Sequence, residues 1–217
     1  MLLSGGIDSA TALYVTKASN SVRAITFEYH GIARQELRAA REIAASAGVR
    51  EHRFVRLPDL KEAGDIAGSE FGGLPPTYIP LRNSIFYSFA ASYAEEVGAS
   101  LIVGGHNRDD ERVFEDVGSI FFGDLERSFR AASPILRRSE IAISRPLKDR
   151  SKPEVIRLAA SLRVPLDLTW SCHGSGGHHC WHCDGCLARE RAFTAAGVPD
   201  PLALKSGGKL LKQWKNR

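Results

Sequence analysis

Short apolar runs alternate with amphipathic stretches along most of the chain. The apolar runs predict buried strands at 23–27, 52–57, 100–104 and 141–143. Apolar residues at helical spacing predict helices at 35–47, 84–96, 120–130, 151–162 and 186–196. Because strands that alternate with helices form a parallel sheet covered on both faces, the predicted fold class is α/β with a doubly wound, mostly parallel sheet.

The same pattern suggests how the chain is divided. We expect residues 1–150 to form an α/β domain and residues 151–217 to form a helical region packed on it, the two making one compact unit. The stretch at 58–77 is rich in glycine and ends near two prolines, so it is predicted to be a loop with some helix near 60–63. A functional lid and an ordinary surface loop both fit this composition.

Composition narrows the class of protein. The 217 residues are 43% hydrophobic and 25% charged, which fits one globular unit with a substantial core. Since no apolar run approaches the length of a membrane span and the N-terminus lacks a signal-peptide pattern, we expect a cytoplasmic protein with no membrane partner. Much of the net charge of +4 lies in the C-terminal tail, which contains Lys205, Lys209, Lys212, Lys215 and Arg217. Without an aromatic-rich basic stripe, nucleic-acid binding is not expected.

A glycine-rich segment opens the chain, Ser4-Gly5-Gly6-Ile7-Asp8-Ser9, and runs into a predicted helix. Its paired glycines allow a tight turn with free N–H groups, and a helix N-terminus attracts phosphate. No Gly-Lys-Ser/Thr follows, which excludes a Walker loop. An ordinary turn is the alternative. In a parallel sheet, this segment and those after Phe27 and Val103 would converge on one cleft.

The four cysteines all fall within fifteen positions, as Cys172, Cys180, Cys183 and Cys186. Such spacing favours a single metal ion held by four sulfurs, and zinc is the simplest candidate. An iron–sulfur centre and free thiols remain alternatives. Neighbouring histidines can replace a cysteine or stay outside the ligand set; these are His173, His178, His179 and His182.

With these features placed, the chain resembles the 7-cyano-7-deazaguanine synthase family within the PP-loop ATP pyrophosphatases. The segment Ser4–Ser9 matches the PP-loop signature, which several other families share. More specific matches are 27–31 with Arg34 and Glu36, then 78–83, where Leu81 replaces a usual glycine. Further matches are Pro146-Leu147, Ser151-Lys152, Glu154, Thr169-Trp170-Ser171-Cys172, the cysteines, Arg189, Phe193, Gly197, Asp200 and Pro201.

One segment departs from the bacterial pattern of that family. Residues 107–118 keep Asn107, Asp110, Asp116 and an aromatic at Phe114, but they lack the usual Ser-Gly and Cys-Arg pairs. This acidic stretch after Gly105-His106-Asn107 is closer to archaeal-type relatives. The identity of the acid substrate is the expectation that this departure weakens most.

The resemblance implies a PP-loop, Rossmann-like fold with a small C-terminal zinc region, and a homodimer. It implies conversion of 7-carboxy-7-deazaguanine and ammonia into the nitrile with ATP and Mg²⁺, through adenylation of the carboxylate, an amide and a second adenylation. The implied zinc ligands are the four cysteines. The implied catalytic residues are Ser4, Asp8, Ser9, Arg82 and Lys152. The implied nucleotide-binding residues are Leu3, Ser4, Gly5, Gly6, Ile7, Asp8, Ser9, Phe27, Tyr29, Arg82, Asn83, Gly105, His106 and Asn107.

Candidate substrate contacts are His30, Asp110, Phe114 and Asp116. Taken from the residues alone, Asp8 can place Mg²⁺ or merely cap the helix, and Arg82 and Lys152 can contact phosphate or form surface ion pairs. Phe27 and Tyr29 can stack on a purine, although Phe27 also reads as core.

Three other functions stay open. One is a PP-loop tRNA sulfurtransferase, which would need a reactive cysteine outside the metal cluster. Another is an enzyme that couples the activated acid to a different amine, and the third is a zinc-stabilised nucleotide or nucleic-acid binding module.

Overall fold

The computed structural model describes residues 1–60, 79–174 and 176–205. Its strands are β1 (Arg23–Tyr29), β2 (Glu51–Leu57), β3 (Leu101–Val103) and β4 (Ala142–Ser144). Its longer helices are α1 (Ile7–Lys17), α2 (Arg34–Ala47), α3 (Arg82–Val97), α4 (Ser119–Ala132), α6 (Lys152–Ser161) and α7 (Asp184–Ala196). Short helices are α5 (Pro134–Arg138), α8 (Pro201–Lys205) and the 3₁₀ turns Asp110–Arg112, Glu115–Val117 and Leu166–Leu168.

The predicted strands and longer helices are confirmed to within a few residues at each end. Helices α2, α3 and α7 end at Gly48, Gly98 and Gly197, each in the left-handed conformation that glycine adopts easily. Helix α6 begins with the predicted capping box between Ser151 and Glu154. The pattern of apolar residues did not predict α5 and α8, because five residues are too few to show helical periodicity.

The strands form a parallel arrangement that the N-terminal segment joins. β1 pairs with β2 and β3 pairs with β4, both in parallel. Between them, Leu3 N–H donates to the Ile25 carbonyl at 2.9 Å, and Leu2 N–H donates to the Val103 carbonyl at 2.9 Å. The resulting order is β2, β1, residues 1–3, β3, β4, which confirms the doubly wound α/β class. Along the chain, strands are first added on one side of residues 1–3 (β1, β2) and then on the other side (β3, β4). Ligands bind at such a reversal of strand order in doubly wound sheets.

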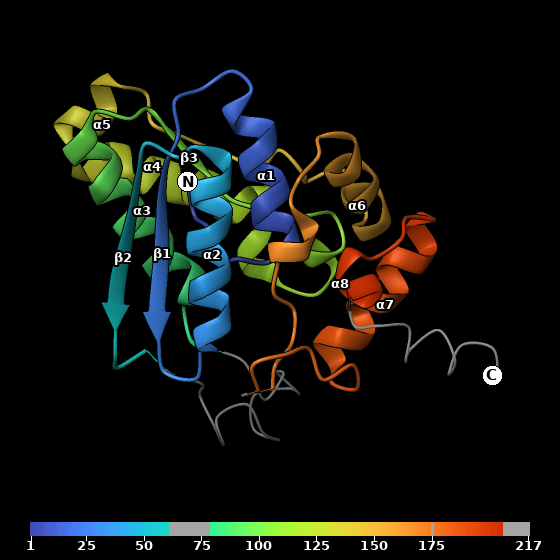
Figure 1. Ribbon diagram of the computed structural model, residues 1–217. Helices are drawn as coiled ribbons and strands as arrows, with labels where there is room; N and C mark the ends of the chain where they lie inside the picture. The colour runs from blue at the N-terminus through green and yellow to red at the C-terminus, as the bar shows by residue number, and fades with distance from the viewer. Residues whose placement is uncertain (61–78, 175, 206–217) are drawn as a thin grey trace.

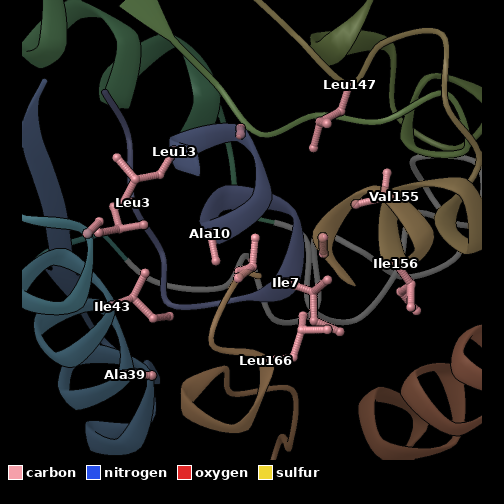
Figure 2. Packing of buried hydrophobic residues seen from close by; sticks show 14 of the residues in the cluster. Leu3, Ile7, Ala10, Leu13, Ala39, Ile43, Leu147, Val155, Ile156 and Leu166 are labelled. Carbon is pink, nitrogen blue, oxygen red and sulfur yellow. The ribbon is translucent and has the colours of Figure 1, made fainter. Parts of the chain in front are cut away.

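Helices cover both faces of this sheet (Figure 1). One apolar cluster packs α1 against α2 and α6, with Leu3, Ile7, Leu13 and Ile43 among its buried members (Figure 2). The other cluster joins β1 and β3 to α3 and α4. The first cluster draws residues from both sides of position 150, since Val155 and Phe193 belong to it. The domain division at 150 remains a prediction.

Some sequence expectations fall outside the described residues. These are residues 61–77 of the predicted loop with most of its short helix, Tyr78 of the matched motif, and the basic tail beyond Lys205. Within the described residues, no helix is both long and apolar enough to cross a membrane.

Candidate active site and metal centre

A cavity of about 330 Å³ opens where the sheet order reverses. It lies at the carboxyl ends of residues 1–3, β1 and β3, and the first turn of α3 closes one side. The structure therefore brings the three predicted segments to one crevice. Most of the predicted nucleotide-binding residues line it, namely Leu3, Ser4, Gly6, Asp8, Ser9, Phe27, Tyr29, Arg82, Asn83, Gly105 and His106.

The glycine-rich loop is held by its two serines. Ser9 Oγ lies 3.0 Å from Ser4 Oγ and donates to the Gly6 carbonyl at 3.1 Å. The N–H groups of Ser4 and Gly6 donate to these same hydroxyls, at 3.2 and 3.3 Å. Gly6 is the N-cap of α1, so backbone donors at the start of this helix face the crevice. A phosphate oxygen is a better acceptor for these donors than a hydroxyl, because it carries charge.

Two glycines are required by close backbone contacts. Gly5 has φ of +87°, and a Cβ there would lie 2.5 Å from the Glu36 carbonyl oxygen. A Cβ on Gly105 would lie 2.8 Å from the Ser9 backbone nitrogen. The start of α1 is thus packed directly against α2 on one side and against the end of β3 on the other, which fixes the loop in place.

Polar side chains connect the start of α1 to the segment after β3. Asp8 forms an ion pair with Lys152 and accepts a hydrogen bond from Asn107 Nδ2 at 3.3 Å. Asn107 N–H donates to Asp110 Oδ2 at 2.9 Å, and Lys152 N–H donates to Asp109 Oδ2 at 2.8 Å. The Asp8 carboxylate makes no helix-capping bond. It lies instead beside the one lysine that the sequence predicted for phosphate contact.

Asp110 belongs to the same network, and its role in substrate binding stays a prediction. Burial raises the pKa of Asp110, and the hydrogen bond from Asn107 opposes that shift. His106 is half-buried, and desolvation lowers its pKa to about 4, so its imidazole is neutral near pH 7. A neutral imidazole in the crevice can accept or donate a single hydrogen bond.

Arg82 begins α3 and lines the crevice. The residue before it, Leu81, has φ of +51° and is 67% exposed. Leu81 therefore keeps the left-handed conformation typical of the glycine it replaces. Asn83 Nδ2 donates to the Asp116 carbonyl at 3.2 Å, so Asp116 contributes its backbone to this wall.

Aromatic rings form the wall beside β1. Phe27 stacks on Phe86 with ring centroids 4.1 Å apart and is only 5% exposed, which fits the core interpretation. Tyr29 lies 5.7 Å from the same ring. Sequence reasoning missed Phe86 and Tyr87 as crevice residues, because Phe86 belongs to a helical stripe that indicates core packing and Tyr87 lies in the same helix without any motif to mark it. Tyr87 is fully buried, and its hydroxyl has no hydrogen-bond partner among the described residues.

The remaining predicted site residues lie elsewhere. His30 is exposed after β1 and is not among the residues that line the crevice. Phe114 is 39% exposed in the segment between two 3₁₀ turns. Gly5, Ile7 and Asn107 support the crevice from behind without lining it. Roles for His30, Phe114 and Asp116 in substrate binding stay predictions.

The four cysteines form the group that the spacing predicts. Their sulfurs all lie within 4.8 Å of one another, with 3.9 Å between Cys180 and Cys186 and 3.9 Å between Cys172 and Cys183. A tetrahedral zinc ion with Zn–S bonds near 2.3 Å has sulfur–sulfur edges of about 3.8 Å. The sulfurs can therefore hold one metal ion of this kind.

Backbone N–H groups point at these sulfurs, as thiolate ligands require. Gly174 and Cys180 N–H donate to Cys172 Sγ at 3.3 and 3.4 Å, and Cys183 N–H donates to Cys180 Sγ at 3.3 Å. His179 Nε2 accepts a hydrogen bond from the Ser171 N–H at 3.2 Å, so this histidine is engaged outside the ligand group. The donor set is the four sulfurs, and none of the neighbouring histidines belongs to it within the described chain.

Comparison with known proteins places the chain in a family. Residues 1–197 match the family described as queuosine biosynthesis protein QueC. The 7-cyano-7-deazaguanine synthase of Trichodesmium erythraeum is 38% identical over 93% of this chain and 98% of its own length. The protein of the same name from Thermoplasma acidophilum, an archaeal relative, is 34% identical over 93% of this chain and 90% of its own length.

Among solved structures, the NMN synthetase of Francisella tularensis has a TM-score of 0.49 and 18% identity, and the match covers 94% of this chain and 79% of that one. That likeness is too low to support any inference. The family match and the similarity to the two synthases show that the chain belongs to the QueC family of queuosine biosynthesis proteins.

Proposed function

We propose that this chain is a 7-cyano-7-deazaguanine synthase, which uses ATP to convert 7-carboxy-7-deazaguanine and ammonia into the nitrile. The observation that supports this most is the crevice. It gathers Ser4, Gly6, Asp8, Ser9 and Arg82 at the reversal point of the sheet, and Lys152, which does not itself line the crevice, pairs with Asp8. Relatives named for this reaction match nearly the whole chain.

The chemistry explains why a phosphate-binding crevice is needed. A carboxylate is a poor electrophile, and its oxygen is a poor leaving group. Transfer of AMP to the carboxylate oxygen releases pyrophosphate and makes an acyl adenylate, which ammonia converts into the amide. A second adenylation, on the amide oxygen, lets that oxygen leave with AMP and gives the nitrile.

Individual residues at the crevice have separate roles in the adenylation. The N–H groups at the start of α1 bind the pyrophosphate end of ATP, and Lys152 and Arg82 offset charge on the phosphates. Asp8 fixes the Lys152 ammonium by an ion pair. It also presents a carboxylate oxygen of the kind that Mg²⁺ prefers, and Mg²⁺ when bound neutralises pyrophosphate charge. Catalysis rests on positioning and charge stabilisation, since the Ser4 and Ser9 hydroxyls of the crevice bond to each other and to the loop backbone rather than to a base.

The metal at the four cysteines is proposed to be zinc with a structural role. Four cysteine sulfurs fill all four positions of a tetrahedral zinc ion, so no coordination position is left for a substrate. Two of these cysteines, Cys172 and Cys186, are almost completely buried. A homodimer and a cytoplasmic location, both expected from the sequence, are part of this proposal. Light scattering on the purified protein tests the first.

The decisive experiment is product analysis. Purified protein is incubated with ATP, Mg²⁺, ammonium and 7-carboxy-7-deazaguanine, and the product mass and pyrophosphate release are measured. A nitrile formed without tRNA supports the proposal. A product that retains an amide or carries a different amine, or turnover that requires tRNA, contradicts it. Lys152→Ala should abolish pyrophosphate release, whereas Lys148→Ala, at an exposed position, is the matched control.

A further inference from the structure

Two acidic side chains line the crevice, Asp8 and Glu36. Asp8 is occupied, because it pairs with Lys152 and accepts from Asn107. The Glu36 carboxylate accepts no hydrogen bond and forms no ion pair within the described residues, although the side chain is half-buried. A partly desolvated carboxylate that makes no hydrogen bond within the described residues is costly, so its position in the crevice calls for a ligand.

The structure holds Glu36 firmly beside the phosphate-binding loop. It lies in the first turn of α2, and the close approach of Gly5 to its carbonyl fixes its backbone. Two charged or titratable groups from other elements act on the carboxylate, Arg82 from α3 and His173 from the segment within the cysteine cluster. Burial raises the pKa of Glu36, and these two groups oppose that shift.

We infer that Glu36 is the ammonium site of the crevice: its carboxylate binds the substrate ammonium ion and accepts one proton from it. This rests on the proposed function, since only an enzyme that consumes ammonia needs such a site. Ammonium is the main form of ammonia near neutral pH, and it has no lone pair with which to attack. A proton acceptor beside the activated acid lets the abundant ammonium form supply the attacking nitrogen.

The amide forms by proton transfer to Glu36 followed by displacement of AMP. Ammonium gives one proton to the Glu36 carboxylate, which becomes a carboxylic acid, and the freed nitrogen lone pair forms the C–N bond at the acyl carbon. The C–O bond to AMP breaks and AMP leaves with the electron pair. The nitrogen of the adduct loses a second proton to water, giving the amide. Glu36 then returns its proton to water. A carboxylate with a raised pKa accepts a proton more readily than an exposed one.

Hydroxylamine separates this role from a structural one. It is largely neutral near pH 7.5, so it attacks the acyl adenylate without prior loss of a proton and yields a hydroxamate. For Glu36→Gln, we expect ammonium-dependent product formation to fall by about 100-fold, within the usual range for loss of a general base. Hydroxamate formation and ATP-dependent pyrophosphate release should stay within about threefold of wild type. Glu42→Gln, at an exposed residue of the same helix paired with Arg38, is the control.

The pH profile gives a second readout. Free ammonia grows about tenfold for each pH unit below the pKa of ammonium, so the ammonium-dependent rate of Glu36→Gln should climb steeply from pH 7 to 9. The wild-type rate should climb less. Glu36→Asp, which keeps the carboxylate on a shorter chain, should recover part of the rate at pH 7 and serves if the glutamine variant does not fold.

The experiment has four possible outcomes. Equal loss of nitrile, hydroxamate and pyrophosphate in Glu36→Gln would overturn the inference and assign Glu36 to ATP binding or to structure. An unchanged ammonium dependence would also overturn it. If the wild-type protein forms neither nitrile nor hydroxamate from 7-carboxy-7-deazaguanine, the proposed function itself fails, and the inference fails with it. Selective loss with ammonium supports both.

Discussion

The backbone N–H of Trp170 donates a hydrogen bond to the carbonyl of Gly5, with 2.9 Å between nitrogen and oxygen. Trp170 lies two residues before the first cysteine of the metal cluster, and its indole N–H donates to the Cys172 carbonyl at 2.7 Å. The segment that leads into the cluster therefore supports the glycine-rich loop Ser4–Ser9 directly. From the other side, Gln35 Nε2 in the first turn of α2 donates to the Gly176 carbonyl at 2.7 Å.

This connection predicts that metal binding and nucleotide binding depend on one another. Cys186→Ser removes a fully buried ligand, so we expect loss of the bound metal and, through Trp170 and Gly5, weaker ATP binding by about tenfold or more. Metal content by mass spectrometry and ATP affinity by calorimetry measure the two effects. His178→Ala, at an exposed site in the same loop, should keep both. A metal-free variant that binds ATP normally would show that the connection carries no coupling.

The turn at Gly5 gives a second prediction. In Gly5→Ala, the new Cβ would meet the Glu36 carbonyl oxygen while the backbone keeps φ of +87°, so the loop must shift. We expect ATP-dependent pyrophosphate release to fall by at least about 100-fold. Gly48→Ala shares the positive φ but meets no atom within 4 Å, so it should cost about 1 kcal/mol of stability and leave activity intact. Equal activities for the two variants would contradict this account.

The sequence predicted the order of strands and helices because each longer element carries its own periodicity and its own glycine or capping box. The grouping of the four cysteines was also predictable from their close spacing, and the glycine-rich segment was expected in the crevice because it follows the first strand of a parallel sheet. The pairing of Lys152 with Asp8 was not, because 144 positions separate these residues and only the packed fold joins them. His30 was expected at the substrate site through its motif; it is exposed and does not line the crevice, and its role stays a prediction.

Leu81 offers a test of backbone strain. A side chain other than glycine costs about 1–2 kcal/mol in the left-handed region, whereas glycine loses about 0.5–1 kcal/mol in chain entropy. Leu81 is 67% exposed, so little burial is lost on its removal. We expect Leu81→Gly to raise the free energy of unfolding by about 0.5 kcal/mol, measured by urea titration. Ile120→Gly, exposed but inside α4, should lower it by about 1 kcal/mol.

The buried ion pair between Arg189 and Asp200 predicts where the C-terminal region is most sensitive. Its two N–O distances are 2.6 and 2.9 Å, and the guanidinium also donates to Thr169 Oγ1 at 2.8 Å. Both side chains are almost completely buried. Asp200→Asn leaves the Arg189 charge uncompensated, so we expect a loss of about 3 kcal/mol in unfolding free energy. Glu42→Gln, which breaks an exposed pair, should cost less than about 0.5 kcal/mol, and similar losses in the two variants would argue against a structural role for Arg189.

The lowered pKa of His106 predicts how the stability of the fold changes as the pH falls. Burial lowers its pKa from 6.5 to about 4, so below pH 6.5 the unfolded chain binds a proton that the folded chain does not. Stability is thus lost as the pH falls from 6.5 towards 4, by roughly 2 kcal/mol at pH 5 from this residue. His106→Asn removes the titrating group, and chemical denaturation at pH 5 and pH 8 measures the difference. We expect the variant to lose less stability than wild type between these two pH values, whatever its absolute stability. An identical slope would mean that the His106 ring reaches water in solution and takes up its proton in the folded state.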